Sequence, residues 1–338
     1  MKNFLIRLFV CLVKPLLPKH RGDRFLIVTT TGLGDTLWGT PAIRVLREAY
    51  PQAYIAVLTS PLGKQVLQNN PHINEIFVTK TAPVLILFKR KISTIFVFHT
   101  SQRAVLPFCA LLGAVRIVGT EKMNKGLDFL LTDLLPLKKH HEIERRLEIV
   151  AQVGCPISSR LMEFFPSSSD KEKAASLMPP GIVIGLHPGA KDKFKQWTPS
   201  HFIGLGQKLK KHLQCQIVIT GTPPEKELVE TIASAIEGAI PIYEHISIPT
   251  LAAIVDKLAL YITNDTGPLH VACTTKTPTI ALFTPTDAQL CGPYFASHVK
   301  VIQKQPTCSP CSKKKCHDAF CMLQISPDEV YQEALKLL

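Results

Sequence analysis

Short apolar segments alternate along the chain with longer segments in which apolar residues recur at helical spacing. In the first half, strands are expected at residues 25–30, 54–59, 75–80, 94–100 and 115–120. In the second half, strands are expected at residues 181–188, 216–221, 260–264, 279–284 and 299–303. Apolar strands that alternate with helices are typical of parallel sheets covered by helices on both faces. The pattern therefore predicts an α/β protein with two doubly wound, Rossmann-like parallel sheets.

The two runs of strands are separated by residues 155–180, which contain several prolines and serines. Such a change in composition favours a linker between domains. We expect an N-terminal segment over residues 1–22, a first domain over 23–165, a second domain over 180–325 and a final helix over 326–338. Ligands of open parallel sheets bind at the carboxyl ends of the strands, so the active site is expected there, in the cleft between the two domains.

The first 20 residues combine apolar side chains with spaced cations. Arg7 and Lys14 are seven positions apart, so they share one face of a helix. Arg7 interrupts the apolar core that a signal peptide would need, and no stretch of 18 uncharged apolar residues is present to form a spanning helix. Two interpretations remain open. The basic flank favours a helix that lies in the surface of an anionic membrane, and the alternative is a helix packed on its own domain.

The overall charge points to an anionic partner. The chain has 39 Lys and Arg against 26 Asp and Glu, a formal net charge of +13. Phosphate, nucleic acid and an acidic membrane surface all fit such an excess. Only 7% of the residues are aromatic, and no basic run is interleaved with aromatic residues, so no nucleic-acid partner is expected.

A glycine turn, Gly32-Leu33-Gly34-Asp35, follows the first predicted strand and opens a helix. Leu37 stands where a dinucleotide fingerprint would have its third glycine, and no Lys-Ser/Thr completes a P-loop. What remains is a carboxylate, Asp35, at the carboxyl end of a strand. It can serve as a general base, or it can simply favour the helix start through the helix dipole.

The second half carries a comparable segment, Asn264 to His270, between a strand and a helix. Thr266 and Gly267 can offer backbone N–H groups to a diphosphate, and His270 lies about one turn into the helix. Asp265 can anchor the loop through backbone N–H groups.

Two more strand ends in this half carry candidate donor contacts. Lys195 belongs to a lysine-rich loop that Trp197 can fix by packing, so it is a candidate phosphate contact. Glu225 can bind a ribose diol or cap its own helix, and the cap is favoured without further support.

Four cysteines crowd together near the end of the chain: Cys308, Cys311, Cys316 and Cys321. Their spacing is compatible with a structural zinc site that lies away from the donor motifs. Reduced thiols fit equally well, and disulfides fit least.

These segments together give the chain a family resemblance. It resembles the heptosyltransferases of glycosyltransferase family 9, which have the two-domain GT-B fold. The resemblance covers roughly residues 25–338 and rests on TGLGDTLWGTPAIRVLREAYP, GLHPGAKDKFKQW, VITGTPPEKEL and NDTGPLHVA. The cysteine segment and the ISPDEV helix extend it. About two dozen residues precede the first strand, whereas many family members begin directly with that strand.

The resemblance implies an inverting glycosyltransferase that needs no metal or other cofactor for catalysis. It implies ADP-heptose as the donor and the lipid A-linked inner core of lipopolysaccharide as the acceptor, on the cytoplasmic face of the inner membrane. Asp35 matches the proposed general base, Lys195 the lysine that contacts the donor's phosphate and sugar, and Glu225 the acidic residue near the ribose. Asp265, Thr266, Gly267 and His270 match the donor loop, and Ile246 falls where the backbone meets adenine. His99 and Arg103, just past a strand end, are our candidate acceptor contacts.

Three other functions remain as alternatives. A nucleotide-sugar epimerase of the same architecture would need no lipid acceptor. A non-catalytic protein that binds sugar nucleotides or lipids would have no need of Asp35 and Lys195. A nucleic-acid binder is suggested by the charge alone.

Overall fold

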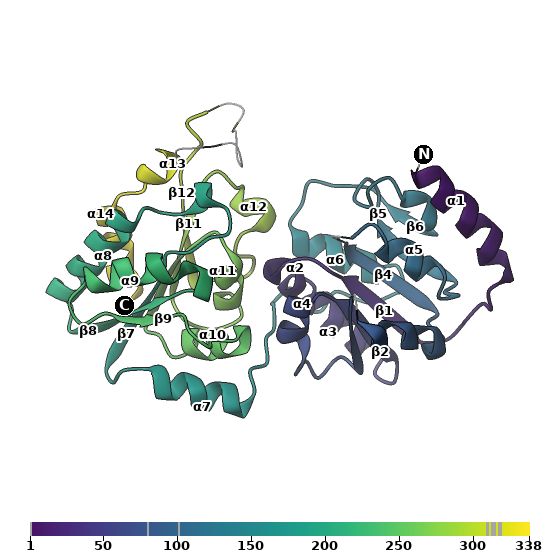
Figure 1. Cartoon of the computed structure of the whole chain (residues 1–338), viewed down its shortest axis with the longest axis horizontal. Helices are drawn as coiled ribbons and strands as arrows, with labels where there is room; N and C mark the ends of the chain where they lie inside the picture. The colour runs from purple at the N-terminus through teal and green to yellow at the C-terminus, as the bar shows by residue number, and fades with distance from the viewer. Residues whose placement is uncertain (1, 80, 101, 309–310, 312–315, 317–319) are drawn as a thin grey trace. The chain divides into compact units, whose positions relative to one another are not determined.

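A computed structural model of the chain describes residues 2–79, 81–100, 102–308, 311, 316 and 320–338 (Figure 1). The chain folds into two compact units, Met1–Phe165 and Pro166–Leu338. Each unit contains one six-stranded sheet. Both sheets are parallel throughout and have the same doubly wound arrangement, so the predicted fold class is confirmed.

In the N-terminal unit the strands lie in the order β3-β2-β1-β4-β5-β6. Their bounds are β1 Arg24–Thr29, β2 Tyr54–Thr59, β3 Glu75–Val78, β4 Thr94–His99, β5 Arg116–Thr120 and β6 Asp133–Leu135. The helices are α1 Lys2–Val13, η1 Lys14–Leu16, α2 Leu33–Leu37, α3 Thr40–Ala49, α4 Pro61–Leu67, η2 Ala82–Arg90, α5 Val105–Ala110, η3 Asp128–Leu130 and α6 Glu142–Ala151, where η marks a 3₁₀ helix.

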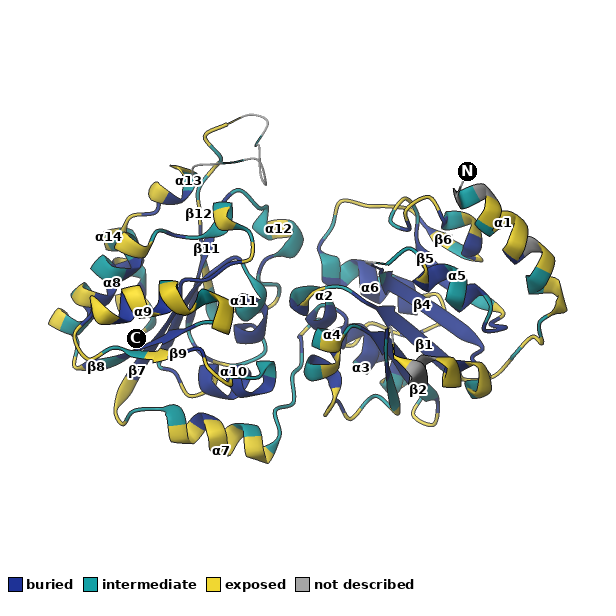
Figure 2. Cartoon of the chain, viewed as in Figure 1, coloured by how far each residue is buried: buried dark blue, intermediate teal, exposed yellow. Residues whose placement is uncertain are grey.

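One face of this sheet packs on a buried cluster that α1, α5 and η2 share. Leu26 and Val28 of β1 point into this cluster. Because successive residues of a strand point to opposite faces, Phe25 and Ile27 face the other side. Figure 2 shows the strands buried and much of α1 exposed. The sheet is thus covered on both faces, as its continuous apolar strands predict.

In the C-terminal unit the strands lie in the order β12-β11-β10-β7-β8-β9. Their bounds are β7 Ile182–His187, β8 Cys215–Thr220, β9 Ile240–Ile242, β10 Leu260–Asn264, β11 Thr279–Phe283 and β12 Val299–Gln303. The helices are α7 Ser168–Leu177, η4 Lys193–Lys195, α8 Pro199–His212, η5 Pro223–Glu225, α9 Lys226–Ser234, α10 Ile248–Val255, α11 Gly267–Ala272, α12 Ala288–Cys291, α13 Phe320–Leu323 and α14 Pro327–Leu337.

Two buried clusters fill the two faces of this second sheet. Helices α8, α9 and α14 contribute to one cluster, and α7, α10 and α11 to the other. Ser326 caps α14 by accepting a hydrogen bond from the backbone N–H of Glu329. The final helix therefore belongs to the packed C-terminal unit.

The structure differs from the sequence prediction in two respects. Strands β6 and β9 were not predicted, because each has three residues and lies at a sheet edge, and β9 contains a proline. The expected linker is also partly wrong, because it contains α7. Ser167 and Asp170 form a capping box at the start of that helix, which overrides the proline-rich composition around it.

In the part of the chain that the structure describes, no helix is both long enough and apolar enough to cross a membrane.

Candidate functional site

Asp35 lies in the first turn of α2, directly after the carboxyl end of β1. Gly32 is the N-cap of this short helix and has extended backbone. The Thr36 hydroxyl donates a hydrogen bond of 2.9 Å to the Gly32 carbonyl and closes the turn. The glycine turn thus places a carboxylate at the strand end, where the sequence predicts it.

A buried guanidinium holds Asp35 in place. The Arg146 side chain is fully buried on α6, and its Nη2 donates to Asp35 Oδ1 at 3.2 Å. Its Nη1 donates to Glu142 Oε2 at 2.7 Å and to the Glu142 carbonyl at 2.8 Å. The guanidinium carbon lies 5.4 Å from the ring centroid of Trp38, close enough for a cation–π contact. Two carboxylates and one aromatic ring thus surround a single buried cation.

Arg145 and His99 belong to the same neighbourhood. Arg145 Nη1 donates to Glu142 Oε1 at 2.7 Å. Burial lowers the pKa of His99, and the charge of Asp35 opposes this shift. The His99 Nδ1 and the Arg103 Nε are buried and have no hydrogen-bond partner among the described residues. A polar ligand bound here could supply the hydrogen bonds that these two atoms lack.

In the C-terminal unit, Lys195 and Asp265 come together. Lys195 Nζ donates to Asp265 Oδ2 at 2.5 Å. Asp265 is buried at the end of β10, whereas Lys195 on η4 is partly exposed. The carboxylate therefore fixes an ammonium group that retains some solvent exposure, and an ammonium so placed can also contact an anionic ligand.

Asn264 connects the same two loops through its side chain. Its Oδ1 accepts a hydrogen bond of 3.0 Å from the backbone N–H of Trp197, and its Nδ2 donates to the Pro188 carbonyl at 2.9 Å. The Trp197 ring is 1% exposed, and its Nε1 donates to the Ile325 carbonyl at 2.8 Å. The prediction that Trp197 fixes the lysine-rich loop by packing is confirmed.

Glu225 caps its own helical turn. Its Oε2 accepts hydrogen bonds from the backbone N–H and the hydroxyl of Thr222, at 2.9 and 2.7 Å. The carboxylate also lies against Gly189, where a Cβ would force the end of the Glu225 side chain to move. Burial lowers the pKa of the neighbouring His187 to about 4, and the charge of Glu225 opposes the shift. A contact between Glu225 and ribose stays a prediction.

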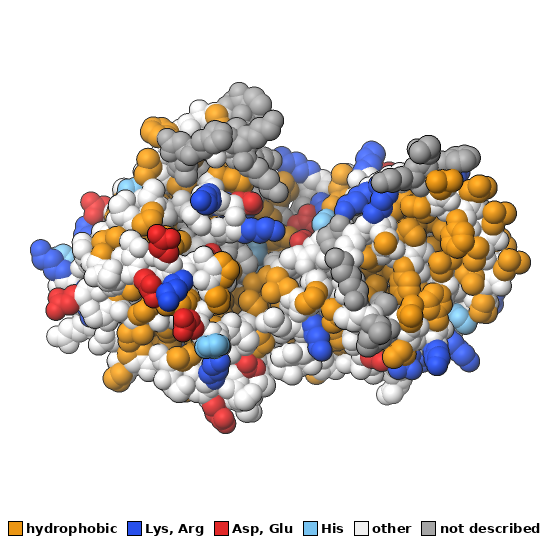
Figure 3. Space-filling view, in the orientation of Figure 1, with side chains coloured by type: hydrophobic (Ala, Val, Ile, Leu, Met, Phe, Trp, Pro, Cys, Tyr) orange, Lys and Arg blue, Asp and Glu red, His pale blue; other side chains and the backbone are white. Residues whose placement is uncertain are grey.

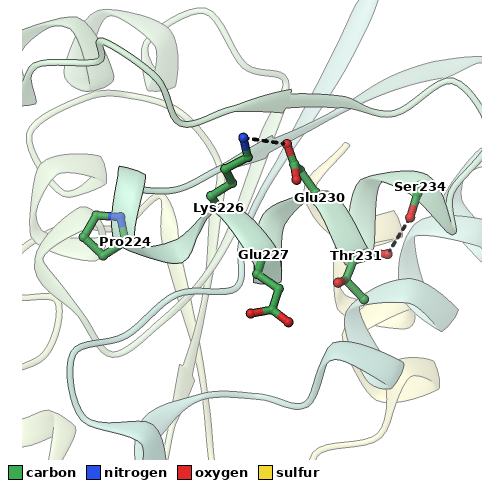
Figure 4. A pocket seen from close by; sticks show the side chains of 6 residues that line it. All are labelled: Pro224, Lys226, Glu227, Glu230, Thr231 and Ser234. Atoms are coloured by element: carbon green, nitrogen blue, oxygen red, sulfur yellow. Dashed lines mark hydrogen bonds and ion pairs between the residues drawn. The ribbon is translucent and has the colours of Figure 1, made fainter.

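The remaining donor candidates lie on two helix starts of the same unit. Thr266 is the N-cap of α11, Gly267 its first residue, and His270 is buried within it. Ile246 is partly buried directly before Ser247, the N-cap of α10. A hollow of about 560 Å³ lies elsewhere, along α9 (Figure 4). It is lined by Pro224, Lys226, Glu227, Glu230, Thr231 and Ser234, none of which is a predicted site residue.

The zinc site predicted for the cysteines gains no support. Among the described residues, which include Cys308, Cys311, Cys316 and Cys321, no group of three or more His, Cys, Asp or Glu is gathered closely enough to hold a metal ion. Residues 309–310, 312–315 and 317–319 between them lie outside the described residues.

Sequence reasoning missed Arg146, Glu142 and Asn264. A signal for Arg146 was present. In α6, Ile143, Leu147 and Val150 form an apolar stripe at helical spacing, and Arg146 occupies a position within it. A charged residue on an apolar face is buried and therefore needs partners.

Comparisons with known proteins place the chain in a family. The model of glycosyltransferase family 9 (heptosyltransferase) matches residues 103–320, more than half of the chain. Lipooligosaccharide heptosyltransferase 2 of Campylobacter jejuni is 24% identical over 328 residues, which cover 93% of this chain and 98% of the relative.

Two solved structures share the fold. A family 9 glycosyltransferase from Veillonella parvula matches with a TM-score of 0.81 at 22% identity, and the match covers 94% of this chain and 98% of that one. The E. coli ADP-heptose lipopolysaccharide heptosyltransferase II matches with a TM-score of 0.77 at 21% identity, covering 93% and 98%. The chain therefore belongs to glycosyltransferase family 9, the heptosyltransferase family, and is a glycosyltransferase.

Proposed function

We propose that this protein transfers a heptosyl group from ADP-heptose to the inner core of lipopolysaccharide, with inversion at the anomeric carbon and without a catalytic metal. Family membership supports heptosyl transfer, and the names of the relatives support the donor and the acceptor. The single observation that carries the proposal is a carboxylate at a strand end, held by a buried arginine.

In this proposal Asp35 is the general base. It takes the proton from the acceptor hydroxyl while that oxygen attacks the anomeric carbon. Arg146 is a positioning residue, because it contacts the Oδ1 atom of Asp35 and is itself anchored by Glu142. Because Oδ2 makes no contact with Arg146, we assign the acceptor hydroxyl to that oxygen.

The donor is bound by the C-terminal unit. Lys195, fixed by Asp265, contacts the phosphate and sugar, while Thr266, Gly267 and His270 contact the diphosphate. Positive charge and backbone N–H groups stabilise the ADP that leaves. The sequence has no D-x-D pair to hold a metal–diphosphate, which supports a reaction that relies on these groups instead. Glu225 binds the ribose, and Ile246 offers its backbone to adenine.

The acceptor is bound by the N-terminal unit. His99 and Arg103 are the proposed contacts, because each has a buried polar atom without a partner among the described residues. A phosphorylated or carboxylated sugar would pair with them and with the excess positive charge of the chain.

The reaction is placed at the cytoplasmic face of the inner membrane, where α1 holds the protein as a peripheral enzyme. The exposed apolar side chains of α1, among them Leu5, Leu8 and Leu12, support this placement.

A donor screen tests the proposal. The purified protein is incubated with a defined lipid acceptor and, in parallel, ADP-heptose, an ADP-hexose and a UDP-sugar, and the lipid is analysed by mass spectrometry. Heptosyl addition from ADP-heptose is expected to be the fastest reaction. Preferential transfer from a UDP-sugar would reject the proposed donor. Conversion of a sugar nucleotide without any acceptor would favour the epimerase.

A further inference from the structure

Two separate segments of the N-terminal unit expose apolar side chains to solvent. One is α1 with η1, where Leu12 is 65% and Leu16 is 83% exposed. The other is the 3₁₀ helix η2, where Leu85 is 63% exposed and Ile86 and Phe88 are exposed as well. Folding normally buries such side chains, so large apolar residues that gather at a surface indicate an interaction site.

Both segments belong to the same layer of the fold. Val10 of α1 and Leu87 of η2 are buried in one cluster, together with Leu106 and Cys109 of α5. The strand residues in that cluster alternate along each strand, so they all lie on one face of the sheet. Helices α1 and η2 therefore cover the same face, and their exposed side chains point away from it.

Helix α5 joins the two segments. It packs against α1, and its Phe108 ring meets Phe88 of η2 edge to face, with ring centroids 5.5 Å apart. Figure 3 shows hydrophobic side chains gathered over the part of this unit where Figure 1 labels α1 and α5. We name the exposed apolar side chains of α1, η1 and η2 the apolar face; they are Leu5, Leu8, Phe9, Leu12, Leu16, Leu85, Ile86 and Phe88.

The charged side chains in the two sequence segments that carry the apolar face are all positive. Residues 1–22 and 79–93 contain no Asp or Glu. Arg7, Lys19, Arg21, Lys89 and Lys91 are exposed cations within these segments. Apolar side chains flanked by cations complement the surface of an anionic bilayer, which offers acyl chains beneath negative headgroups. A second copy of the chain would present the same positive charges and would be repelled.

We propose that η2 is a second membrane-contacting segment, and that α1 and η2 together seat the N-terminal unit on an anionic lipid surface. Two contact segments fix the orientation of a folded unit on a surface. With a single anchoring helix, the unit could still rotate about the axis of that helix. The inference rests on the proposed function in one respect, namely that the acceptor is linked to a lipid. Vesicle binding itself is measured without donor or acceptor.

The experiment uses the full-length protein and vesicles of phosphatidylcholine with or without phosphatidylglycerol. The double variant Leu85→Gln/Ile86→Gln is compared with Leu161→Gln. Leu161 is 52% exposed in the same unit, and its carbonyl accepts a hydrogen bond from Arg44 of α3, outside the apolar face. Circular dichroism and the melting temperature of each variant show that it is folded.

The double variant is expected to bind anionic vesicles at least about tenfold more weakly than the parent, whereas Leu161→Gln binds like the parent. Wild-type binding is expected to fall steeply when phosphatidylglycerol is omitted. Unchanged binding of the double variant would overturn the proposal for η2. A parent protein that self-associates in ultracentrifugation, in a way the double variant abolishes, would overturn it in favour of a second copy.

A depth probe provides a second, independent readout. In Leu85→Trp the indole emission is expected to shift to the blue and to be quenched by brominated lipid when anionic vesicles are added. Leu161→Trp should show neither change. If the Leu85→Trp variant sediments with the vesicles but its emission is not quenched, η2 stays out of the membrane. Heptosyl transfer to a water-soluble acceptor is measured separately, so failure of the proposed function is distinguishable from failure of this inference.

Discussion

Replacing Asp35 by Asn separates the chemical role of this residue from its structural one. Asn keeps an oxygen that can accept the hydrogen bond now made by Arg146 Nη2 at 3.2 Å. It removes the negative charge and, with it, the ability to take a proton from an acceptor hydroxyl. The variant should therefore fold like the parent and fail in the chemical step.

The two effects differ greatly in size. The Asp35 side chain is 27% exposed and Arg146 keeps Glu142 as a partner, so the loss in unfolding free energy should be about 1 kcal/mol or less. Loss of a general base lowers the rate by about 10²–10⁴, which corresponds to roughly 3–5 kcal/mol of transition-state stabilisation. Donor affinity should change little, because the proposed donor contacts lie on other residues.

The matched control is Glu142→Gln, which also alters a carboxylate that contacts Arg146. Glu142 accepts from both Arg146 and Arg145 at 2.7 Å, so this variant should lose more stability than Asp35→Asn, about 1–3 kcal/mol. Its rate should fall less than about tenfold. Initial rates of ADP release with saturating donor and acceptor, together with melting temperatures, measure both quantities. A rate for Asp35→Asn near that of the parent, or equal losses of rate in the two variants, would refute the assignment of Asp35 as the base.

Three further predictions concern the C-terminal unit. Lys195→Ala should weaken ADP binding at least about tenfold, measured by calorimetry. EDTA should leave heptosyl transfer by the parent protein intact, and magnesium-dependent recovery after chelation would contradict the metal-independent mechanism. Trp197→Phe removes the donor to the Ile325 carbonyl and should cost about 1–3 kcal/mol of stability in denaturant, and an unchanged midpoint would show that this bond contributes nothing. Burial lowers the pKa of His187 to about 4, so the unfolded chain binds more protons than the folded chain between about pH 4 and 6.5. The unfolding free energy of this unit should therefore fall as the pH drops through that window, by at most about 3 kcal/mol. A His187→Asn variant should show a shallower fall.

The fold was predictable because its central strands are mostly apolar. β1, β7 and β10 are buried over nearly their whole length, so they stand out as continuous apolar runs. The edge strands β6 and β9 carry little such signal, because each pairs on one side only and has three residues. Helix α7 was hidden by the prolines around it, although its capping box can be read in the sequence.

The candidate site was predictable where a residue lies in the loop or helix start that follows a strand. Asp35 and Asp265 come at strand ends, and parallel topology places such residues at the functional edge of a sheet. Arg146 reaches Asp35 across 111 positions of sequence, through the packing of α6 against β4. No local pattern in the sequence indicates that these two residues meet.

A single-turnover reaction tests the central claim most directly. Enzyme in excess over a defined lipid A-linked core acceptor is mixed with ADP-heptose, and both the intact lipid mass and the released ADP are followed over time. The account predicts that each acceptor gains one heptosyl residue, that ADP appears in equal amount and at the same rate, and that Asp35→Asn slows both together. ADP release without a gain in lipid mass, or a converted sugar nucleotide with no lipid product, would contradict it.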